Sequence, residues 1–334
     1  MTQDFILYAT AYYNHRYQAG EIAWHTWSNS LSHIRSFETF LQGKHMDINK
    51  ITPELLQSYK EYCLRQGNQT ATVNRKLLPL AMTLKEAQRE GIVAPDRWLH
   101  LSDIYLSKKT GYRSGESAGE SEVVRFLTDG QMAQLVQLYD SLPDSPRRDA
   151  LEIFLFSFHA CGLRVSDIVT LEWHHIHRSD ATLRKTMVKT RGSLVIPLSA
   201  PALEILDRWE QRGLNRRFVF GLLPEDFDFS DAGALERAVD NRNHSLRVHL
   251  NNIGKELGFP FPLGMHVARH TFAVKALNTG RVDVHLISRL LGHSSVTVTE
   301  KVYATFLLPT LSNELRTRLS FPEYGVSKCS LPLP

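Results

Sequence analysis

The chain has 334 residues, of which 43% are hydrophobic and 22% are charged. This composition is typical of globular proteins, and the length is sufficient for two domains. The formal net charge of +4 at pH 7 permits a nucleic-acid partner but requires none. Three widely spaced cysteines argue against a disulfide framework or a cysteine metal site. The sequence has no apolar run of about 20 residues that could span a membrane and no signal peptide, so we expect a cytoplasmic protein without membrane contact.

Residues 1–106 are predicted to form a bundle of four to five short helices. Apolar residues recur at intervals of three and four over residues 5–13 and 24–41, which is the period of a helix with one buried face. Thr52-Pro53 predicts the start of a third helix, with threonine as the cap and proline in the first turn. A fourth helix is expected over residues 70–90.

A linker is predicted to separate this bundle from a second domain. Residues 107–122 are rich in serine, glycine and charged residues and have no apolar periodicity, which is typical of flexible linkers. The second domain is expected over residues 123–320, and residues 321–334 are expected to form a C-terminal tail. Basic and acidic residues are nearly balanced on both sides of the linker, so any DNA-binding surface must arise from the placement of charge.

The second domain begins with two predicted helices and a break. Thr128 caps a helix that runs through Tyr139, and residues 149–160 form a helix that is apolar nearly all round. Gly162 suits the break that follows. Ser166 is then expected to start the next helix.

The middle of this domain is predicted to hold a hairpin between helices. Residues 182–198 alternate as strands do, with a turn at Arg191-Gly192. Amphipathic helices are predicted over residues 201–213 and 244–257. Residues 221–242 are acidic and weakly patterned, so we expect a variable surface segment there. The histidine tract at residues 174–177 lacks partners at metal-ligand spacing and is interpreted as a solvated turn.

Residues 262–303 combine polar side chains with helical periodicity. His266 and Arg269 are three residues apart and share one face of a predicted helix. The apolar residues at 286–291 predict a second buried helix, which Gly292 ends. His293 would lie just past that helix end, with Tyr303 ten residues further along. Apolar residues between 306 and 319 then predict a last helix, which docks either on its own domain or on a neighbouring protomer.

These motifs resemble those of the tyrosine recombinases, which include phage-type integrases, Xer-type resolvases and DNA invertases. The sequence reads GLRVSD at residues 162–167, HVARHTFA at residues 266–273 and LLGH at residues 290–293, and a tyrosine follows at Tyr303. The interval from His293 to that tyrosine is ten residues, where the family more often has nine. The ninth residue, Val302, cannot act as a nucleophile, so Tyr303 is the candidate.

The resemblance implies a mostly α-helical protein with two domains. Residues 1–106 would form the SAM-like core-binding domain, which binds DNA. Residues 123–320 would form a helical catalytic domain with a small antiparallel sheet. The motifs of the catalytic half carry this resemblance, and the N-terminal half resembles the family only loosely.

The resemblance also implies a DNA-cleaving site. Arg164 and Arg269 would clamp the non-bridging oxygens of a DNA phosphate, and His293 would donate a further hydrogen bond. Tyr303 would attack phosphorus and form a 3′-phosphotyrosyl intermediate. His266 would take the tyrosine proton, because its ordinary pKa near 6.5 suits a general base.

A lysine on the hairpin would protonate the leaving 5′ oxygen. Lys189 lies eight residues before Pro197, which is the family spacing, and Lys185 is the competing candidate. Asp167 matches an acidic position that braces the first arginine. Three other histidines are interpreted as structural and receive no catalytic role: His159, His270 and His285.

The implied activity is site-specific DNA recombination without cofactors. The nearest carboxylate grouping is Glu225, Asp226 and Asp228 on a predicted loop, which does not suit two metal ions. The reaction would need neither metal nor ATP, and the active unit would be a tetramer on two sites in double-stranded DNA. Since no arm-binding domain is expected before residue 1, a simple integrase or invertase is favoured. The alternatives are a type IB topoisomerase, which religates the same strand, and a catalytically silent DNA-binding regulator.

Overall fold

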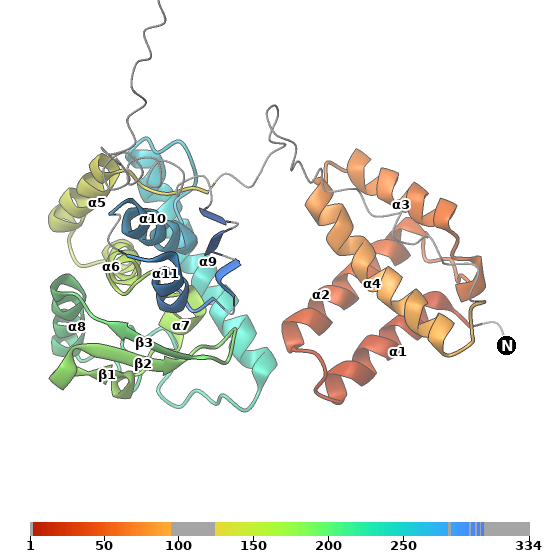
Figure 1. The fold of residues 1–334 in the computed structure, drawn as a ribbon, viewed down its shortest axis with the longest axis horizontal. Helices are drawn as coiled ribbons and strands as arrows, with labels where there is room; N and C mark the ends of the chain where they lie inside the picture. Colours follow the sequence, from red (N-terminus) through yellow and green to blue (C-terminus); the bar gives the residue numbers. More distant parts are fainter. Residues whose placement is uncertain are drawn as a thin grey trace, which may run out of the picture. The chain divides into compact units, whose positions relative to one another are not determined.

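The structure is a computed structural model that describes residues 3–94, 124–279, 282–293, 295–297, 299–300 and 302–303. The chain divides into two compact units between Ser121 and Glu122, and each unit is described by itself (Figure 1). The predicted linker at 107–122 and the helix predicted after Tyr303 lie outside the described residues. Among the described helices, none is long and apolar enough to cross a membrane.

The first unit is a helical bundle, as its apolar periodicity predicts. Its α-helices are α1 (Phe5–Gln18), α2 (Trp24–Phe40), α3 (Pro53–Arg65) and α4 (Thr70–Arg89), with a 3-10 turn at Ile48–Lys50. Asp4 caps α1 by accepting from Leu7 N at 3.0 Å, and Thr52 caps α3, which confirms the predicted helix start. The core of the bundle lies where α2 packs on α1 and α4, with Phe37 and Tyr59 among its fully buried side chains.

The second unit begins with helices around a central α6. Its first elements are α5 (Asp129–Ser141), α6 (Pro146–His159) and α7 (Val165–Val169). Thr128 forms a capping box with Gln131 at the start of α5, which confirms the predicted cap. Eight consecutive residues of α6 are buried, because helices α5, α8, α9 and α10 all pack around it (Figure 1).

A three-stranded antiparallel sheet lies beside these helices. The strands are β1 (Ile176–His177), β2 (Thr182–Thr186) and β3 (Ser193–Pro197), in the order β1-β2-β3. Thr186 pairs with Ser193 at the loop end of the β2–β3 hairpin, so residues 187–192 form its loop. This confirms the predicted hairpin.

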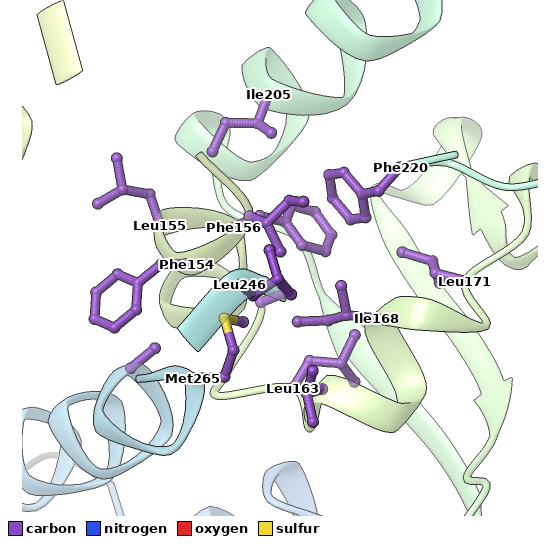
Figure 2. Close-up of a cluster of buried hydrophobic side chains, with 14 of the residues drawn as sticks. Phe154, Leu155, Phe156, Leu163, Ile168, Leu171, Ile205, Phe220, Leu246 and Met265 are labelled. Carbon is purple, nitrogen blue, oxygen red and sulfur yellow. The ribbon is translucent and has the colours of Figure 1, made fainter. Parts of the chain in front are cut away.

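The remaining helices complete the unit. They are α8 (Ala200–Arg212), α9 (Ala232–Glu256), α10 (Met265–Asn278) and α11 (Val284–Leu290). The main core joins them to the first half of the unit: Figure 2 shows Phe154 and Phe156 of α6 grouped with Leu246 of α9 and Met265 of α10. A smaller cluster packs α10 on α11 and includes Tyr303.

Three local predictions were wrong. Residues 221–242 are not all loop, because α9 begins at Ala232, where Asp231 caps it by accepting from Gly233 N. The side chains of its first turns are mostly half-buried and not buried in the core, so they carry a weak apolar pattern. Helix α7 begins at Val165 rather than at Ser166, with Arg164 in the cap position. Leu286 is 47% exposed and not part of a buried face.

Candidate active site

Arg269 lies at the centre of the site, on the buried face of α10. Its guanidinium donates from Nη1 to Gly162 O at 2.8 Å and from Nη2 to Leu291 O at 2.5 Å. It therefore joins the loop after α6 to the C-terminal end of α11. Burial, together with the neighbouring charge of Arg164, lowers the pKa of this guanidinium to about 10. Arg269 remains a cation at neutral pH.

Gly162 is required for this approach. Its φ of +72° lies in the left-handed region, and a Cβ added here would come within 3.0 Å of the Arg269 Cα and 3.1 Å of its Cγ. The glycine of the GLRVSD motif therefore lets the backbone of one segment lie directly against the second arginine.

Arg164 approaches the same end of α11 from the start of α7. Its Nη2 donates to Gly292 O at 3.2 Å, and its Nη1 donates to Met187 Sδ at 3.4 Å. Burial lowers the pKa of Arg164, and the charge of Asp167 opposes that effect. The two guanidinium groups thus donate to consecutive carbonyls, those of Leu291 and Gly292, although 105 residues separate them in sequence (269 − 164).

Asp167 connects α7 to the hairpin. Its carboxylate is 1% exposed, and its Oδ1 accepts from Val188 N at 2.8 Å. Its Oδ2 has no hydrogen-bond partner in the part of the chain that the structure describes. Burial raises the pKa of Asp167, and the Val188 N–H and nearby cations oppose the rise. The hydrogen bond of Asp167 therefore goes to the backbone beside Lys189, and its interaction with Arg164 is one of charge.

The two candidate lysines lie in different environments. Lys185 is on β2, is 8% exposed, and donates from Nζ to Thr170 O at 2.7 Å. Burial lowers its pKa, and Asp167 is the first of the carboxylates that oppose this. Lys189 is exposed in the hairpin loop. Only Lys189 of this pair has an ammonium group that is open to a ligand.

His293 follows α11 directly and is half-buried. Its Nδ1 lies 2.7 Å from the Oγ1 of the buried Thr299. Burial lowers the pKa of His293 to about 4, and the charges of Arg269 and Arg164 contribute. The imidazole is therefore neutral at pH 7. A neutral ring that accepts from Thr299 at Nδ1 carries its hydrogen on Nε2.

His266 lies one turn before His270 on α10, and their ring centroids are 6.5 Å apart. Its side chain is exposed. Partial removal from water lowers its pKa, and the charges of the two arginines and of Lys189 lower it further. His266 is therefore within electrostatic reach of the same cationic groups.

Tyr303 is buried, with 1% of its surface exposed. It packs in the smaller cluster against α10 and α11, and its hydroxyl lies 2.8 Å from His270 Nδ1. Burial raises the pKa of Tyr303 to about 12, and the charge of Arg269 partly opposes the rise. The sequence analysis interpreted His270 as structural, although its position four residues after His266 on the same helix face was a signal.

The site thus draws its side chains from α7, the hairpin, α10 and the segment after α11. The sequence analysis missed two of the contacts, those of His270 and Thr299. Among the described residues, no group of three His, Cys, Asp or Glu side chains could hold a metal ion.

Comparison with known proteins supplies the family. Residues 125–307 match the phage integrase family, and residues 4–102 match the phage integrase SAM-like domain. The chain belongs to the phage integrase family. Its two matched regions correspond to the two compact units, and they confirm the mostly helical fold with an N-terminal SAM-like domain and a C-terminal catalytic domain.

Relatives of this integrase-family chain are named tyrosine recombinases. It is 25% identical over 269 residues to tyrosine recombinase XerD of Pseudomonas putida, which covers 80% of this chain and 83% of the relative. It is 26% identical over 274 residues to tyrosine recombinase XerC of Bacillus licheniformis, covering 81% and 82%. The integrase-family chain is therefore a tyrosine-type site-specific DNA recombinase, as the sequence motifs predicted.

Solved structures show the same fold. A Tn1549 transposon integrase in complex with transposon right-end DNA has a TM-score of 0.67 and 16% identity, covering 95% of this chain and 100% of that one. A lambda integrase tetramer bound to a Holliday junction has a TM-score of 0.57 and 19% identity, covering 86% and 77%. At these identities the likeness concerns the fold.

Proposed function

We propose that this recombinase cleaves DNA with Tyr303 as the nucleophile and with Arg164, Arg269 and His293 as the phosphate-binding groups. The observation that carries the proposal is the meeting of two guanidinium groups at the end of α11, that of the buried Arg269 and that of the half-buried Arg164. The charge of Arg269 also acts on the buried phenol of Tyr303. A phosphodiester repels nucleophiles through its own negative charge. Fixed cations in a poorly hydrated site remove that barrier.

The two arginines suit a phosphate because guanidinium groups are planar and offer paired N–H donors. In the DNA-free protein these donors bond to the carbonyls of Gly162, Leu291 and Gly292, which hold both side chains in place. His293 adds a neutral donor. Its Nδ1 is occupied by Thr299, so its Nε2–H is the atom available to a phosphate oxygen.

The cleavage step balances as a phosphoryl transfer. The Tyr303 oxygen forms a bond to phosphorus as the bond from phosphorus to the 5′ oxygen breaks. The phenolic proton passes to His266 as general base, and Lys189 donates a proton to the departing 5′ oxygen. The products are a 3′-phosphotyrosyl link and a 5′ hydroxyl. A 5′ hydroxyl from another strand can attack the phosphotyrosyl phosphorus and release Tyr303. This reverse reaction joins the strands without ATP.

The proposed partner is double-stranded DNA bound by several protomers. Solved integrases of this fold are described as a dimer bound to a core site and a tetramer bound to a Holliday junction. We extend this to a tetramer on two DNA sites, with the helix predicted after Tyr303 docking on a neighbouring protomer. Because the relatives are named tyrosine recombinases, we also propose that the protein acts on DNA in the cytoplasm.

The test is to trap the covalent intermediate. A binding site is first selected from randomised duplexes and from inverted repeats near the gene, and a nick is placed so that the released 5′ strand diffuses away. Wild type should accumulate a covalent protein–DNA adduct, and Tyr303→Phe should form none while binding the site almost as tightly. Tyr139→Phe, which removes a phenol that donates to Glu152 and not to a residue of the candidate site, is the matched control.

Other outcomes would contradict the proposal. Binding without any wild-type adduct would indicate a DNA-binding regulator. An adduct that persists in Tyr303→Phe would place the nucleophile elsewhere. Relaxation of supercoiled DNA without exchange between two sites would indicate a topoisomerase.

A further inference from the structure

The Tyr303 hydroxyl is paired with His270, a residue that has no part in the proposed cleavage chemistry. His270 Nδ1 lies 2.8 Å from the Tyr303 hydroxyl, and the two rings meet edge to face with centroids 5.8 Å apart. The residues are 33 positions apart in sequence. This contact therefore belongs to the tertiary structure and is not a by-product of one helix.

We propose that His270 is the positioning residue of the nucleophile: it accepts the Tyr303 O–H bond at Nδ1 and holds the phenol inside the domain until DNA is bound. This inference rests on the proposed function only in taking Tyr303 as the nucleophile. The structural part, that His270 holds Tyr303 inward, can be tested without any cleavage.

Burial supports this role. Tyr303 is 1% exposed and belongs to one buried apolar cluster with residues of α10 and α11, namely Ala273, Val274, Leu277, Ile287 and Leu291. A phosphorus atom in a DNA backbone cannot reach an oxygen so enclosed. The conformation described is therefore a resting one, and the phenol must leave His270 before it attacks.

A buried hydroxyl is stable only when it is paired. His270 supplies the partner at the polar edge of an otherwise apolar cluster. Without His270, the buried Tyr303 hydroxyl would have no hydrogen-bond partner. The buried position of the phenol would then be less stable relative to a position exposed to water.

The surroundings favour His270 as the acceptor rather than the donor. The groups that face its ring are His266 and Arg269 on α10, His293 after α11, and Tyr303 itself. Burial lowers the pKa of His270 to about 4, and the charges of His266 and Arg269 contribute. The ring is thus neutral throughout the range in which the enzyme would work, and a neutral ring with Nε2–H leaves Nδ1 free to accept.

The experiment measures the access of reagent to Tyr303 in the DNA-free, full-length protein. Tetranitromethane nitrates exposed phenols, and trypsin releases residues 302–316, in which Tyr303 is the single tyrosine. His270→Leu, which keeps the volume but removes the acceptor, should raise the nitration rate of Tyr303 about two- to tenfold. That range corresponds to the net worth of one neutral hydrogen bond.

Three controls separate a specific effect from unfolding. Tyr139 lies in the same domain and in its own tryptic peptide, residues 126–147, and bonds to Glu152, so its nitration should not change. His270→Asn carries an amide oxygen near the position of Nδ1 and should restore most of the protection. His285→Ala, an exposed histidine on α11, should behave as wild type. Unchanged Tyr303 protection in His270→Leu would overturn the proposal.

A second measurement needs no change at His270. In protein labelled with ¹⁵N-histidine, the His270 ring should show an unprotonated Nδ1 and a protonated Nε2 from pH 6 to pH 8. Tyr303→Phe should shift that Nδ1 resonance and leave the ring of His159 unchanged. An Nδ1–H tautomer, or no shift in Tyr303→Phe, would overturn the proposal even if the His270 variants fail to fold. A wild-type protein in which Tyr303 is protected from nitration but which forms no covalent adduct with DNA would contradict the proposed function instead.

Discussion

Two histidines of the site each meet a hydroxyl through the same ring atom. His270 Nδ1 pairs with the Tyr303 phenol and His293 Nδ1 pairs with the Thr299 hydroxyl. A hydroxyl can donate to an imidazole nitrogen or accept from it, so the role of each bond follows from the tautomer of the ring. In the proposed roles both rings accept at Nδ1: His270 thereby holds the Tyr303 hydroxyl, and His293 keeps its hydrogen on Nε2 for a phosphate oxygen.

Thr299→Val is expected to slow cleavage through His293. Valine keeps the shape of the buried side chain but cannot donate to Nδ1, so the Nε2–H tautomer is no longer enforced. We expect the rate of adduct formation to fall by about tenfold, less than the roughly hundredfold cost of removing such a donor outright. The rate is measured under single-turnover conditions on the nicked substrate.

Thr299→Ser is the control for that change, because it retains the hydroxyl. It should keep most of the wild-type rate. Equal rates for Thr299→Val and wild type would show that the His293 tautomer does not depend on this bond.

At the scale of elements, the hairpin distinguishes the two lysines. Side chains alternate across a strand, so Lys185 on β2 lies on the buried face, and Lys189 in the loop lies outside it. Asp167 holds the base of that loop through Val188 N. The hairpin is therefore fixed to α7, the helix for which Arg164 is the N-terminal cap residue.

Lys189→Ala is expected to lower the cleavage rate by roughly 10² to 10⁴-fold, the usual worth of a general acid. A substrate with sulfur in place of the 5′ oxygen should restore the rate, because a thiolate leaves without a proton. The measurement is the single-turnover rate on both substrates.

Lys185→Met should behave differently from Lys189→Ala. It leaves the carbonyl of Thr170 unpaired, which costs about 1–3 kcal/mol of stability, and the sulfur substrate should not correct any loss of rate. Rescue of Lys185→Met instead would make Lys185 the general acid.

Helix α6 contributes a buried carboxylate that joins three helices. Glu152 is 4% exposed and accepts from the Tyr139 hydroxyl at 2.7 Å, from Arg208 Nε at 2.7 Å and from Trp209 Nε1 at 2.9 Å. It therefore links α6 to α5 and α8.

Glu152→Ala is expected to lower the free energy of unfolding by about 3–5 kcal/mol, because it leaves buried partners unpaired and opens a cavity. Urea unfolding provides the measurement. Glu204→Ala on the exposed side of α8 is the control and should change stability by less than about 0.5 kcal/mol. A similar loss in both variants would contradict the role of Glu152.

At the scale of the whole molecule, half-buried neutral histidines predict sensitivity to acid. Burial lowers the pKa of His175, His270 and His293 to about 4, below the value near 6.5 expected in the unfolded chain. The unfolded state therefore binds more protons between pH 6.5 and pH 4. Stability is fully present above pH 6.5 and is lost as pH falls through that window.

We expect the free energy of unfolding to fall by about 2–4 kcal/mol between pH 7.5 and pH 5, after allowing for the water that reaches these rings. Asp167, whose pKa is raised by burial, has the opposite sign and offsets part of the loss. Urea midpoints at the two pH values measure the effect. A midpoint that stays constant or rises on acidification would contradict it.

The sequence by itself determined the family and most helix boundaries, and it supplied the order of the proposed catalytic residues. These depend on local features. The Thr52 cap and Gly292 mark helix ends, and the three-residue spacing of His266 and Arg269 places both residues on one helix face. Where the local pattern was weak it failed, as at the start of α9.

The tertiary structure alone decided the contacts within the site. It buried Lys185 and exposed Lys189, it turned the Asp167 carboxylate to the hairpin backbone, and it paired Tyr303 with His270. Tyr303 and His270 are 33 residues apart in sequence, and Arg269 and Gly162 are 107 residues apart. No local periodicity encodes such distances, because they arise from how helices pack around a shared core.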